Sequence, residues 1–380
     1  MIYLDNAATT WPKPPIVLQA LGQCLEQYGA NPGRGGHSLS LRSGRMVLAA
    51  RQALASFFGS NRAERWVFTG GATDSVNMAL LGLLNPGDHV IASSLEHNAV
   101  ARPLYNLAKH GVEVSFLDIS PGTGATDPQE VERLLRPNTR LVAISHASNV
   151  TGVVQPLAEI IAVCRQGGSY LLLDAAQTAG LLPIDVETGI DLLAIPGHKS
   201  LYGPPGIGAL YVSPGIDLRP YRFGGTGSHS ESLEQPAIFP DRLESGTLNT
   251  PGIYALQAGL RFVQEEGLDQ IYQREITLAL KLVRGLRSIP GVTVYGWGET
   301  KQVPVIAWDL AGTNSTEVAM ILDQSFQICS RAGLHCAPLV HKALGTLNQG
   351  LVRFSLGYYN TEEEIAQTIS AVKEIAEELR

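Results

Sequence analysis

A lysine follows an apolar segment in the middle of the chain, where its amine could act as a nucleophile. Lys199 comes shortly after the run 192–196 and lies in a turn rich in Gly and Pro. Burial in a cleft lowers the pKa of an ammonium group, and a neutral lysine amine can form a Schiff base with an aldehyde. Because most loop lysines are simply solvated, Lys199 alone does not define a site.

Two further features would complete a site around that amine. The apolar run 170–173 ends in Asp174, at the place where α/β sheets hold ligands, although a helix N-cap would explain this carboxylate as well. Another apolar run breaks into a Gly-rich turn at 70–73 that opens a helix, and free N–H groups there can bind an anion. Each feature alone is weak evidence. An anion turn, a carboxylate and an amine together are the parts that a site for pyridoxal 5'-phosphate (PLP) requires.

These residues lie in a part of the chain where short apolar runs alternate with helical patterns. We predict strands at 65–69, 89–92, 112–116, 140–145, 170–173, 191–195 and 208–212. We predict helices between the earlier strands at 43–58, 76–84, 98–110 and 129–135. This rhythm predicts an α/β domain with a largely parallel sheet, and the short connection between the last two strands predicts an antiparallel pair.

The pattern changes after about residue 252. A long helical stretch at 254–287 precedes short predicted strands at 292–295, 303–309 and 351–355. The C-terminal helix begins at a T-x-x-E capping box formed by Thr361 and Glu364. We therefore predict a smaller α+β domain that packs against the first.

The composition excludes several classes of protein. The 380 residues are 44% hydrophobic and 17% charged, which is too apolar for a disordered chain. The net charge of −7 gives no basic patch for nucleic acid. The four cysteines form no C-x-x-C pair, so we predict neither a metal site nor a disulfide framework. No signal peptide and no apolar run of about 18 residues is present, so we expect a cytoplasmic protein without a membrane span.

Several short motifs, taken jointly, resemble the cysteine desulfurases of the class V aminotransferase superfamily. They are Tyr3-Leu4-Asp5-Asn6-Ala7-Ala8-Thr9-Thr10, Gly71-Ala72-Thr73, Glu96-His97-Asn98, Ser148-Asn149-Val150-Thr151-Gly152, Asp174-Ala175-Ala176-Gln177, Gly197-His198-Lys199, Ser245-Gly246-Thr247 and His335-Cys336-Ala337. The resemblance implies the type I fold of PLP-dependent transferases, with a mostly parallel seven-stranded sheet. It implies a large PLP-binding domain at 15–252 and a small α+β domain, formed by 1–14 and 253–380, that carries the catalytic cysteine.

The resemblance also implies roles around the cofactor. Lys199 matches the lysine that binds the PLP aldehyde and later moves a proton. Asp174 matches the partner of the ring nitrogen, and Gln177 the partner of the phenolic oxygen. His97 matches the catalytic imidazole that stacks on the ring. The other implied cofactor contacts are Ala72, Thr73, Asn149, His198 and Thr247.

The substrate carboxylate is expected at Asn149 and Arg353, which match the carboxylate-binding residues of the family. The position of Arg353 also makes sense without the resemblance. Arg353 lies in an apolar predicted strand, where an unpaired charge is costly and a carboxylate partner would satisfy it. A structural salt bridge with an acidic residue of the protein remains the alternative.

Cys336 matches the cysteine that accepts sulfur in the family. This chemistry needs a thiolate on an exposed or mobile segment; Gly333 would allow local freedom, and His335 could favour the thiolate. The remaining cysteines, at 24, 164 and 329, are expected to be small buried side chains without chemistry.

The resemblance implies a homodimer. Thr247 matches a phosphate contact that the second subunit supplies, and Arg34 matches an arginine that enters the partner's substrate site. A sulfur-acceptor protein is a further expected partner, with iron–sulfur cluster assembly among the pathways served.

The implied reaction converts L-cysteine to L-alanine and leaves the sulfur on Cys336 as a persulfide. The alternatives are a selenocysteine lyase, a C–S lyase and another class V aminotransferase, none of which needs a thiol at this position for simple elimination or transamination. A scaffold without activity is disfavoured by the intact set of Lys199, Asp174 and His97. A nicotinamide dehydrogenase is disfavoured because the chain lacks a strand–G-x-G-x-x-G–helix unit.

Overall fold

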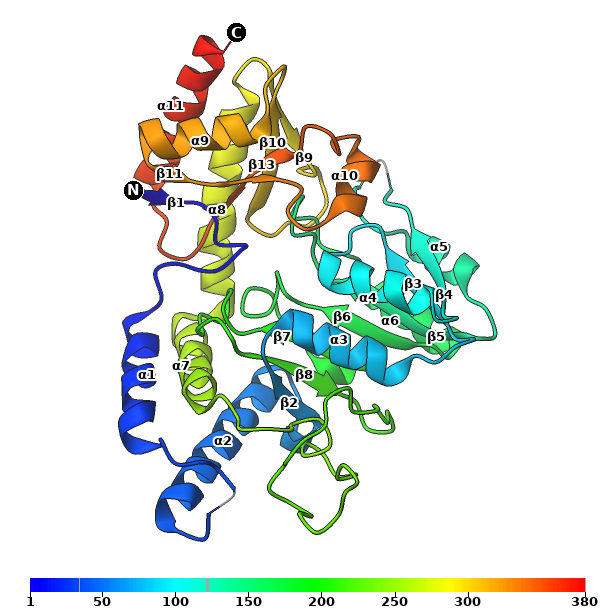
Figure 1. The fold of residues 1–380 in the computed structure, drawn as a ribbon. Coiled ribbons are helices and arrows are strands. Elements are labelled where there is room, and N and C mark those ends of the chain that lie inside the picture. Colours follow the sequence, from blue (N-terminus) through cyan, green and yellow to red (C-terminus); the bar gives the residue numbers. More distant parts are fainter. Residues whose placement is uncertain (34, 121–122, 380) are drawn as a thin grey trace.

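A seven-stranded sheet forms the centre of the large unit of the molecule (Figure 1). The structure is a computed structural model that describes residues 1–33, 35–120 and 123–379. The order of the sheet is β2-β8-β7-β6-β5-β3-β4. The strands are β2 (Trp66–Thr69), β3 (His89–Ser93), β4 (Glu113–Leu117), β5 (Thr139–Ser145), β6 (Tyr170–Asp174), β7 (Leu192–Pro196) and β8 (Gly208–Val212). The strands from β4 to β7 pair in parallel, whereas β8 runs antiparallel to both β7 and β2. The predicted antiparallel pair is confirmed.

Helices cover both faces of this sheet, as the continuously apolar strands predict. Side chains of α3 (Ala72–Leu83) and α4 (Asn98–Ala108) pack on one face. The other face is covered by α2 (Ser38–Phe57), α5 (Pro128–Leu134), α6 (Leu157–Gly167) and α7 (Thr250–Glu266). Alternate residues of one strand serve the two cores: Leu172 points to the first face, and Leu171 and Leu173 point to the second.

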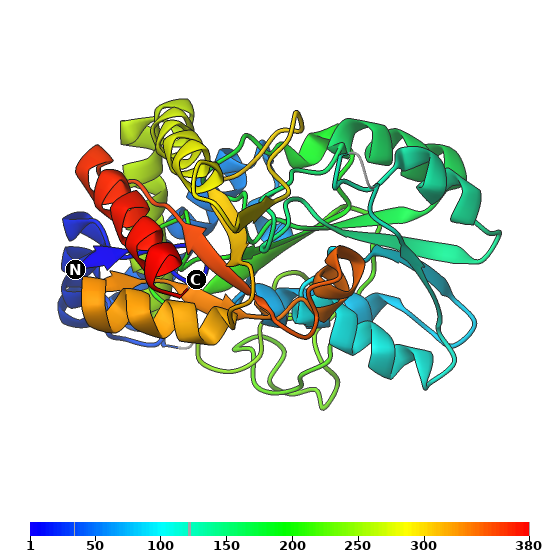
Figure 2. The same ribbon diagram turned by 90° about the horizontal axis from the view of Figure 1, so that it is seen from above.

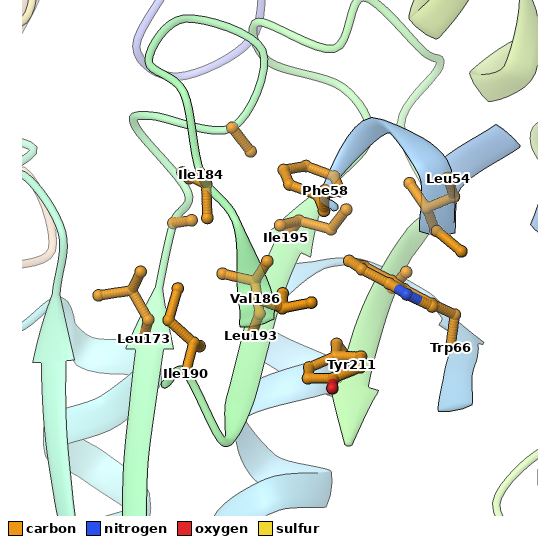
Figure 3. Close-up of a cluster of buried hydrophobic side chains, with 14 of the residues drawn as sticks. Leu54, Phe58, Trp66, Leu173, Ile184, Val186, Ile190, Leu193, Ile195 and Tyr211 are labelled. Carbon is orange, nitrogen blue, oxygen red and sulfur yellow. The ribbon is translucent and has the colours of Figure 1, made fainter. Parts of the chain in front are cut away.

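Aromatic side chains fill the end of the core beneath α2, α5, α6 and α7 that lies beside β2 and β8. Figure 3 shows the Trp66 ring beside Tyr211 and Phe58, with Ile195 and Leu193 from β7 next to them. The Phe58 and Trp66 rings are stacked with their centroids 5.2 Å apart. The helix α1 (Pro15–Gln27) packs outside this layer against α7, and the short turns η1 (Ala63–Arg65) and η2 (Val186–Thr188) connect the elements.

The smaller unit is built on a four-stranded antiparallel sheet with the order β12-β13-β10-β9. The strands are β9 (Val292–Tyr295), β10 (Val305–Leu310), β12 (Arg331–Gly333) and β13 (Leu351–Ser355). The helices α8 (Leu268–Arg287), α9 (Ser315–Phe326) and α11 (Glu362–Glu378) bury its outer face, and Figure 2 shows α11 in red beside α9 in orange. A two-stranded parallel sheet joins β1 (Ile2–Tyr3) to β11 (Ile328–Cys329). The remaining helix is α10 (Pro338–Leu344).

The inner face of the small sheet packs against the large unit. Ala307 and Leu351 belong to one apolar cluster with Leu95 and Val150 from the loops of the large unit. Arg353 is two residues beyond Leu351 on β13, so strand alternation turns its side chain toward the same interface. Phe354 points the other way, into the core beneath α8, α9 and α11.

The predicted helix at 254–287 is wrong in one respect, because the structure divides it into α7 and α8 at Gly267. Gly267 has a φ of +86°, a conformation that few other residues adopt without strain. Side chains of α7 such as Leu256 and Leu260 belong to the core of the large unit. The domain boundary at 252–253 stays a prediction, and this packing supports a later boundary near Gly267.

The helix ends illustrate how local chemistry sets the boundaries. The capping box at Thr361 and Glu364 is confirmed, with both reciprocal hydrogen bonds present. The helix α2 begins five residues before its predicted start, because the His37 imidazole accepts the N–H of Ser40 and caps it. No residue range is predicted from the sequence for α1, α6, α9 or α10. No helix in the described ranges is both long and apolar enough to cross a bilayer.

Candidate active site

A cavity of about 640 Å³ lies between the two units, at the carboxyl ends of β5, β6 and β7. The predicted site residues that line it are Ala72, Thr73, His97, Asn149, Asp174, Gln177, His198, Lys199 and Arg353. Eight of them come from five separate motifs in the large unit, and Arg353 comes from the small unit. Cys336 and Thr247 do not line the cavity, and Arg34 lies outside the described residues. The position agrees with the general rule for ligands in open α/β sheets.

Lys199 sits in the turn that follows β7, and its surroundings favour the neutral amine. Burial lowers the pKa of Lys199 from its ordinary value of 10.5 to about 8. The charge of Asp174 opposes this effect, whereas the guanidinium groups of Arg353 and Arg331 add to it. Lys199 therefore has the two properties expected of a desolvated lysine: it lines the cavity, and its pKa is lowered.

The N-terminal segment clamps the peptide that precedes Lys199. The carbonyl oxygen of His198 accepts hydrogen bonds from the Thr9 hydroxyl at 3.1 Å and from Lys13 Nζ at 2.6 Å. The Thr10 hydroxyl also donates to the carbonyl of Lys199 at 3.0 Å. Lys13 was not singled out by the sequence, and burial lowers its pKa to about 8. This clamp fixes the backbone from which the Lys199 side chain projects.

Asp174 ends β6 and is buried at the cavity wall. Burial raises its pKa, while the N–H of Ala176, 2.9 Å from Oδ1, and the charge of Lys199 favour the carboxylate. The residues after Asp174 form turns rather than a helix, so the N-cap alternative is wrong, and the carboxylate lines the cavity. Gln177 lies beside it, with Nε2 donating to the carbonyl of Ala7 at 3.3 Å.

The Gly-rich turn between β2 and α3 is open toward the cavity. Gly71 has a φ of +144°, and no atom lies within 4 Å of the position that a Cβ would occupy. The first N–H groups of α3 have no partner within the helix. His198 Nδ1 is buried and has no hydrogen-bond partner in the described part of the chain. These donors fit the phosphate group of PLP, which would accept from them. Asp74 also lines the turn, where its carboxylate accepts from Gly70 N–H at 2.8 Å and from the Tyr221 hydroxyl.

His97 caps α4 and presents a neutral ring to the cavity. Its Nδ1 accepts the N–H of Ala99 at 3.0 Å, so the proton of the neutral ring is on Nε2. Burial, with the charge of Lys199, lowers the pKa of His97 to about 4. The preceding residue, Glu96, is fully buried and accepts from the Ser93 hydroxyl and from the N–H and hydroxyl of Ser145. These bonds fix the loop that carries His97 to the end of β5.

Arg353 is almost completely buried, with 1% of its side chain exposed. Its Nη2 donates to Asp5 Oδ1 at 2.7 Å and its Nη1 to the carbonyl of Asn149 at 3.0 Å. The salt bridge weighed as the alternative in the sequence analysis is therefore present, although Arg353 also lines the cavity. Its Nε has no partner among the described residues.

Arg331 is a cavity residue that the sequence analysis missed. It lies directly opposite Arg353 in the pairing of β12 with β13, and both line the cavity. Like charges at facing strand positions repel, so the pair favours an anion nearby. The only signal in the sequence was the place of Arg331 in the segment before Cys336, because the register that joins the two arginines is a tertiary contact.

Cys336 is exposed and lies just outside the cavity. Arg331 lines the cavity and also contacts the Cys336 side chain. Arg331 Nη2 is 3.4 Å from Cys336 Sγ. The expectation that His335 favours the thiolate is not supported: its ring is buried, and its Nε2 donates to the carbonyl oxygen of Leu351 at 3.0 Å. Burial lowers the pKa of His335 to about 2. A neutral imidazole supplies no positive charge, and Arg331 is the cation that contacts the sulfur.

The other predicted residues lie away from the cavity. Cys24 and Cys164 are buried, as expected, whereas Cys329 in β11 is only half-buried because its short strand lies at an edge of the fold. Thr247 is exposed on the loop that precedes α7. Its expected role depends on a second subunit, so it stays a prediction.

Comparisons with known proteins agree with this geometry. A probable cysteine desulfurase of Methanothermobacter thermautotrophicus is 35% identical, covering 99% of this chain and 94% of that protein. A cysteine desulfurase of Klebsiella pneumoniae is also 35% identical, covering 99% and 93%. The apo structure of a cysteine desulfurase from Thermococcus onnurineus has a TM-score of 0.93 at 32% identity, covering 99% and 95%. A cysteine desulfurase structure from Escherichia coli has a TM-score of 0.89 at 31% identity, covering 99% and 94%.

These similarities confirm the resemblance noted from the motifs and the predicted fold class. Residues 2–368 match the family described as aminotransferase class-V. The match includes the turns that carry Asp174 and Lys199 and the strand that carries Arg353. The chain therefore belongs to the aminotransferase class-V family.

Proposed function

We propose that this protein is a PLP-dependent cysteine desulfurase, which converts L-cysteine to L-alanine and transfers the sulfur to Cys336 as a persulfide. The observation that carries the proposal is the single cavity that brings together Lys199, Asp174 and the Gly71 turn, with Cys336 connected to its rim through Arg331. An amine, an acid and an anion turn suit PLP, and the thiol suits sulfur transfer. The names of the relatives support the same activity.

The residues present fit the cofactor. The N–H groups at the start of α3 and the unpartnered His198 Nδ1 would bind the phosphate, together with the Thr73 hydroxyl. Asp174 would bind the ring nitrogen, Gln177 the phenolic oxygen, and the flat ring of His97 would hold the PLP ring in place. When bound, PLP supplies an electrophilic aldehyde and a sink for the electrons released at the substrate α-carbon.

Lys199 has the properties of the nucleophile and the proton carrier. A pKa of about 8 leaves part of the amine neutral at neutral pH, so it can bond to an aldehyde and can accept the α-proton. The clamp on the His198 carbonyl fixes where that amine can reach. His97 has a proton on Nε2, which makes it a donor on the cavity side.

The charge of the cavity favours an amino acid carboxylate. Arg331 and Arg353 face each other, and Asp5 accepts from only one nitrogen of Arg353. A carboxylate of the substrate would add the missing negative charge and would give Arg353 Nε a partner. The carbonyl oxygen of Asn149 accepts a hydrogen bond from Arg353 Nη1, and Asn149 also lines the cavity.

Sulfur transfer follows from the thiol at the cavity rim. The Cys336 thiolate attacks the sulfur of bound L-cysteine, and a new S–S bond forms as the bond between that sulfur and Cβ breaks. The electron pair of the broken bond remains with the carbon fragment, which gains a proton at Cβ and becomes the methyl group of alanine. Cys336 retains the sulfur as a persulfide. Because the thiol lies outside the cavity, the side chain of Cys336 must turn toward the substrate.

We further propose a homodimer in the cytoplasm, with Thr247 of each chain reaching the phosphate in the other and Arg34 reaching the other substrate site. Exposed apolar side chains near these two segments support it: Leu39 and Leu41 at the start of α2, and Phe223 and Ile238 in the long loop after β8. A sulfur-acceptor protein would then receive the persulfide sulfur, and iron–sulfur cluster assembly is a pathway that this sulfur would serve.

The first experiment is a visible spectrum of the purified protein, followed by addition of L-cysteine and measurement of alanine and persulfide. We expect a yellow protein that makes alanine and carries persulfide on Cys336. Lys199→Ala should abolish the PLP absorbance and both products, and Cys336→Ala should abolish the persulfide. A yellow protein that makes no alanine from cysteine would move the substrate to selenocysteine or another amino acid. A protein that does not take up PLP would refute the proposal.

A further inference from the structure

The segment that carries Cys336 has a backbone conformation that side chains rarely adopt. His335 has a φ of +49° and Cys336 a φ of +57°, so two consecutive residues other than glycine are left-handed. Such residues persist only where surrounding contacts hold them. The contacts that impose this shape therefore decide where the Cys336 thiol lies.

Two hydrogen bonds from the wall of the cavity reach this segment. The side-chain amide of Asn149 donates to the carbonyl of His335 at 2.7 Å. The backbone N–H of Asn98 donates to the carbonyl of Cys336, also at 2.7 Å. The second contact is on the reactive residue itself, and it comes from the large unit, whereas Cys336 belongs to the small unit.

The contact from Asn98 follows from the way α4 begins. The first N–H groups of a helix have no partner within the helix and must find one outside it. The His97 imidazole satisfies the N–H of Ala99, which leaves the N–H of Asn98 for the carbonyl of Cys336. The side chain of Asn98 makes no hydrogen bond among the described residues, so the backbone carries this contact alone.

We propose that the backbone N–H of Asn98 is a tether that positions Cys336 for sulfur transfer. It fastens the carbonyl of Cys336 to the residue next to His97, on the cavity wall, and so holds the Cys336 backbone at the cavity rim, from which its side chain turns toward the substrate sulfur. Without the tether, the two left-handed residues relax toward ordinary conformations and carry the thiol away. Asn98 is thus a positioning residue that acts through Cys336, and this role rests on the proposed desulfurase function.

Proline at position 98 tests the tether, because it removes the N–H and puts a ring carbon where the carbonyl oxygen of Cys336 accepts, so the two cannot stay in contact. Proline is favoured at the first position of a helix, and the φ of −64° and ψ of 156° at His97 suit a residue that precedes proline. Asn98→Ala is the matched control, since it removes the side chain and retains the N–H. Both variants should bind PLP with an unchanged visible spectrum.

We expect Asn98→Pro to lower kcat for alanine and persulfide formation at least tenfold, with KM for L-cysteine within twofold of the wild type. Asn98→Ala should stay within twofold in both constants. A purely structural role at the start of α4 would move KM and the visible spectrum as well. Equal kcat in the two variants would overturn the tether.

Hydrogen–deuterium exchange tests the tether without any reaction. In the wild-type protein, the N–H of Asn98 should exchange slowly although it lies in the first turn of a helix. In Asn98→Pro, the N–H groups of residues 335–337 should exchange faster than in Asn98→Ala. Fast exchange at Asn98 in the wild type would overturn the tether even if Asn98→Pro does not fold. If the wild type makes no alanine while the exchange behaves as expected, the tether stands and the proposed function fails.

Discussion

At the scale of single residues, a small number of charged side chains determines the electrostatics of the cavity. Lys199, Arg331 and Arg353 line it with positive charge, and Asp74 and Asp174 line it with negative charge. Asp5 does not line the cavity but pairs with Arg353. Of these acids, Asp5 alone forms a salt bridge with a cavity arginine among the described residues. The charge of Asp5 therefore competes with that of a substrate carboxylate for the same guanidinium group.

This competition predicts opposite effects for two variants of Asp5. Asp5→Asn keeps an oxygen that accepts from Arg353 but removes the charge, so we expect KM for L-cysteine to fall at least twofold. Asp5→Ala leaves the buried charge of Arg353 without its acidic partner and with only the Asn149 carbonyl as acceptor, so we expect KM to rise and the free energy of unfolding to fall by about 2–4 kcal/mol. Steady-state kinetics and urea denaturation measure both. Glu362→Gln, in the exposed pair with Lys281, is the control, with an expected loss below about 1 kcal/mol. Identical KM values for the two Asp5 variants would contradict this account.

The lowered pKa of Lys199 predicts how PLP uptake depends on pH. Only the neutral amine bonds to the aldehyde, and with a pKa of about 8 rather than 10.5 the uptake should rise through a midpoint near pH 8. The rate at which apoprotein gains the PLP absorbance, followed from pH 6 to 10, measures this midpoint. Burial lowers the pKa of Lys13 to about 8 as well, so Lys199→Ala must be measured in parallel to subtract any reaction at Lys13. A midpoint near pH 10 would show that Lys199 is not desolvated.

At the scale of elements, the turn between β2 and α3 depends on the conformation of Gly71. With a φ of +144°, this residue strains any side chain although no atom would clash with a Cβ. We expect Gly71→Ala to lower the free energy of unfolding by about 1–3 kcal/mol and to weaken PLP retention in dialysis, because the anion turn changes shape.

Gly22→Ala provides a matched control for this substitution. Gly22 is exposed within α1, and an added Cβ there would also meet no atom within 4 Å. Its backbone is helical, so alanine should stabilise the protein by about 0.4–1 kcal/mol and leave PLP retention unchanged. Equal effects of the two substitutions would mean that the conformation of Gly71 does not shape the turn.

At the scale of the whole molecule, the cavity exists only where the two units meet. The large unit contributes Lys199 and Asp174 from the ends of its parallel strands, and the small unit contributes Arg331 and Arg353 from the inner face of its sheet. The N-terminal segment spans both, since Asp5 pairs with Arg353 while Thr9 and Thr10 contact the turn before Lys199. Loosening this interface should therefore impair the site before it unfolds either core.

The proposed homodimer predicts the effect of charges placed on its expected interface. The combined change of Leu39→Glu and Leu41→Glu at the start of α2 should halve the molar mass measured by light scattering and reduce PLP retention, because Thr247 of the second chain is lost. Leu280→Glu, at a similarly exposed leucine on α8, should change neither. A wild-type protein that elutes as a monomer with full activity would refute the dimer.

Short-range patterns in the sequence are sufficient to predict most local elements and the chemical groups of the site. The strands at 208–212, 292–295 and 351–355 and the capping box at Thr361 follow from short-range patterns of side-chain size and polarity, and the structure contains each of them. The motif residues Asp174 and Lys199 could be chosen because they end apolar runs, and the ends of parallel strands meet at one edge of a sheet.

How those groups meet depends on tertiary contacts. A single glycine inside a helical pattern does not reveal a break, so the division at Gly267 depended on the packing of α7 against the large sheet. The pairing of Arg331 with Arg353, the salt bridge from Asp5 to Arg353, and the hydrogen bond from Asn98 to Cys336 join residues far apart in the chain or on different strands. Such contacts are set by strand register and by the docking of two separate cores, because both depend on the summed packing of many side chains rather than on any local pattern of residues.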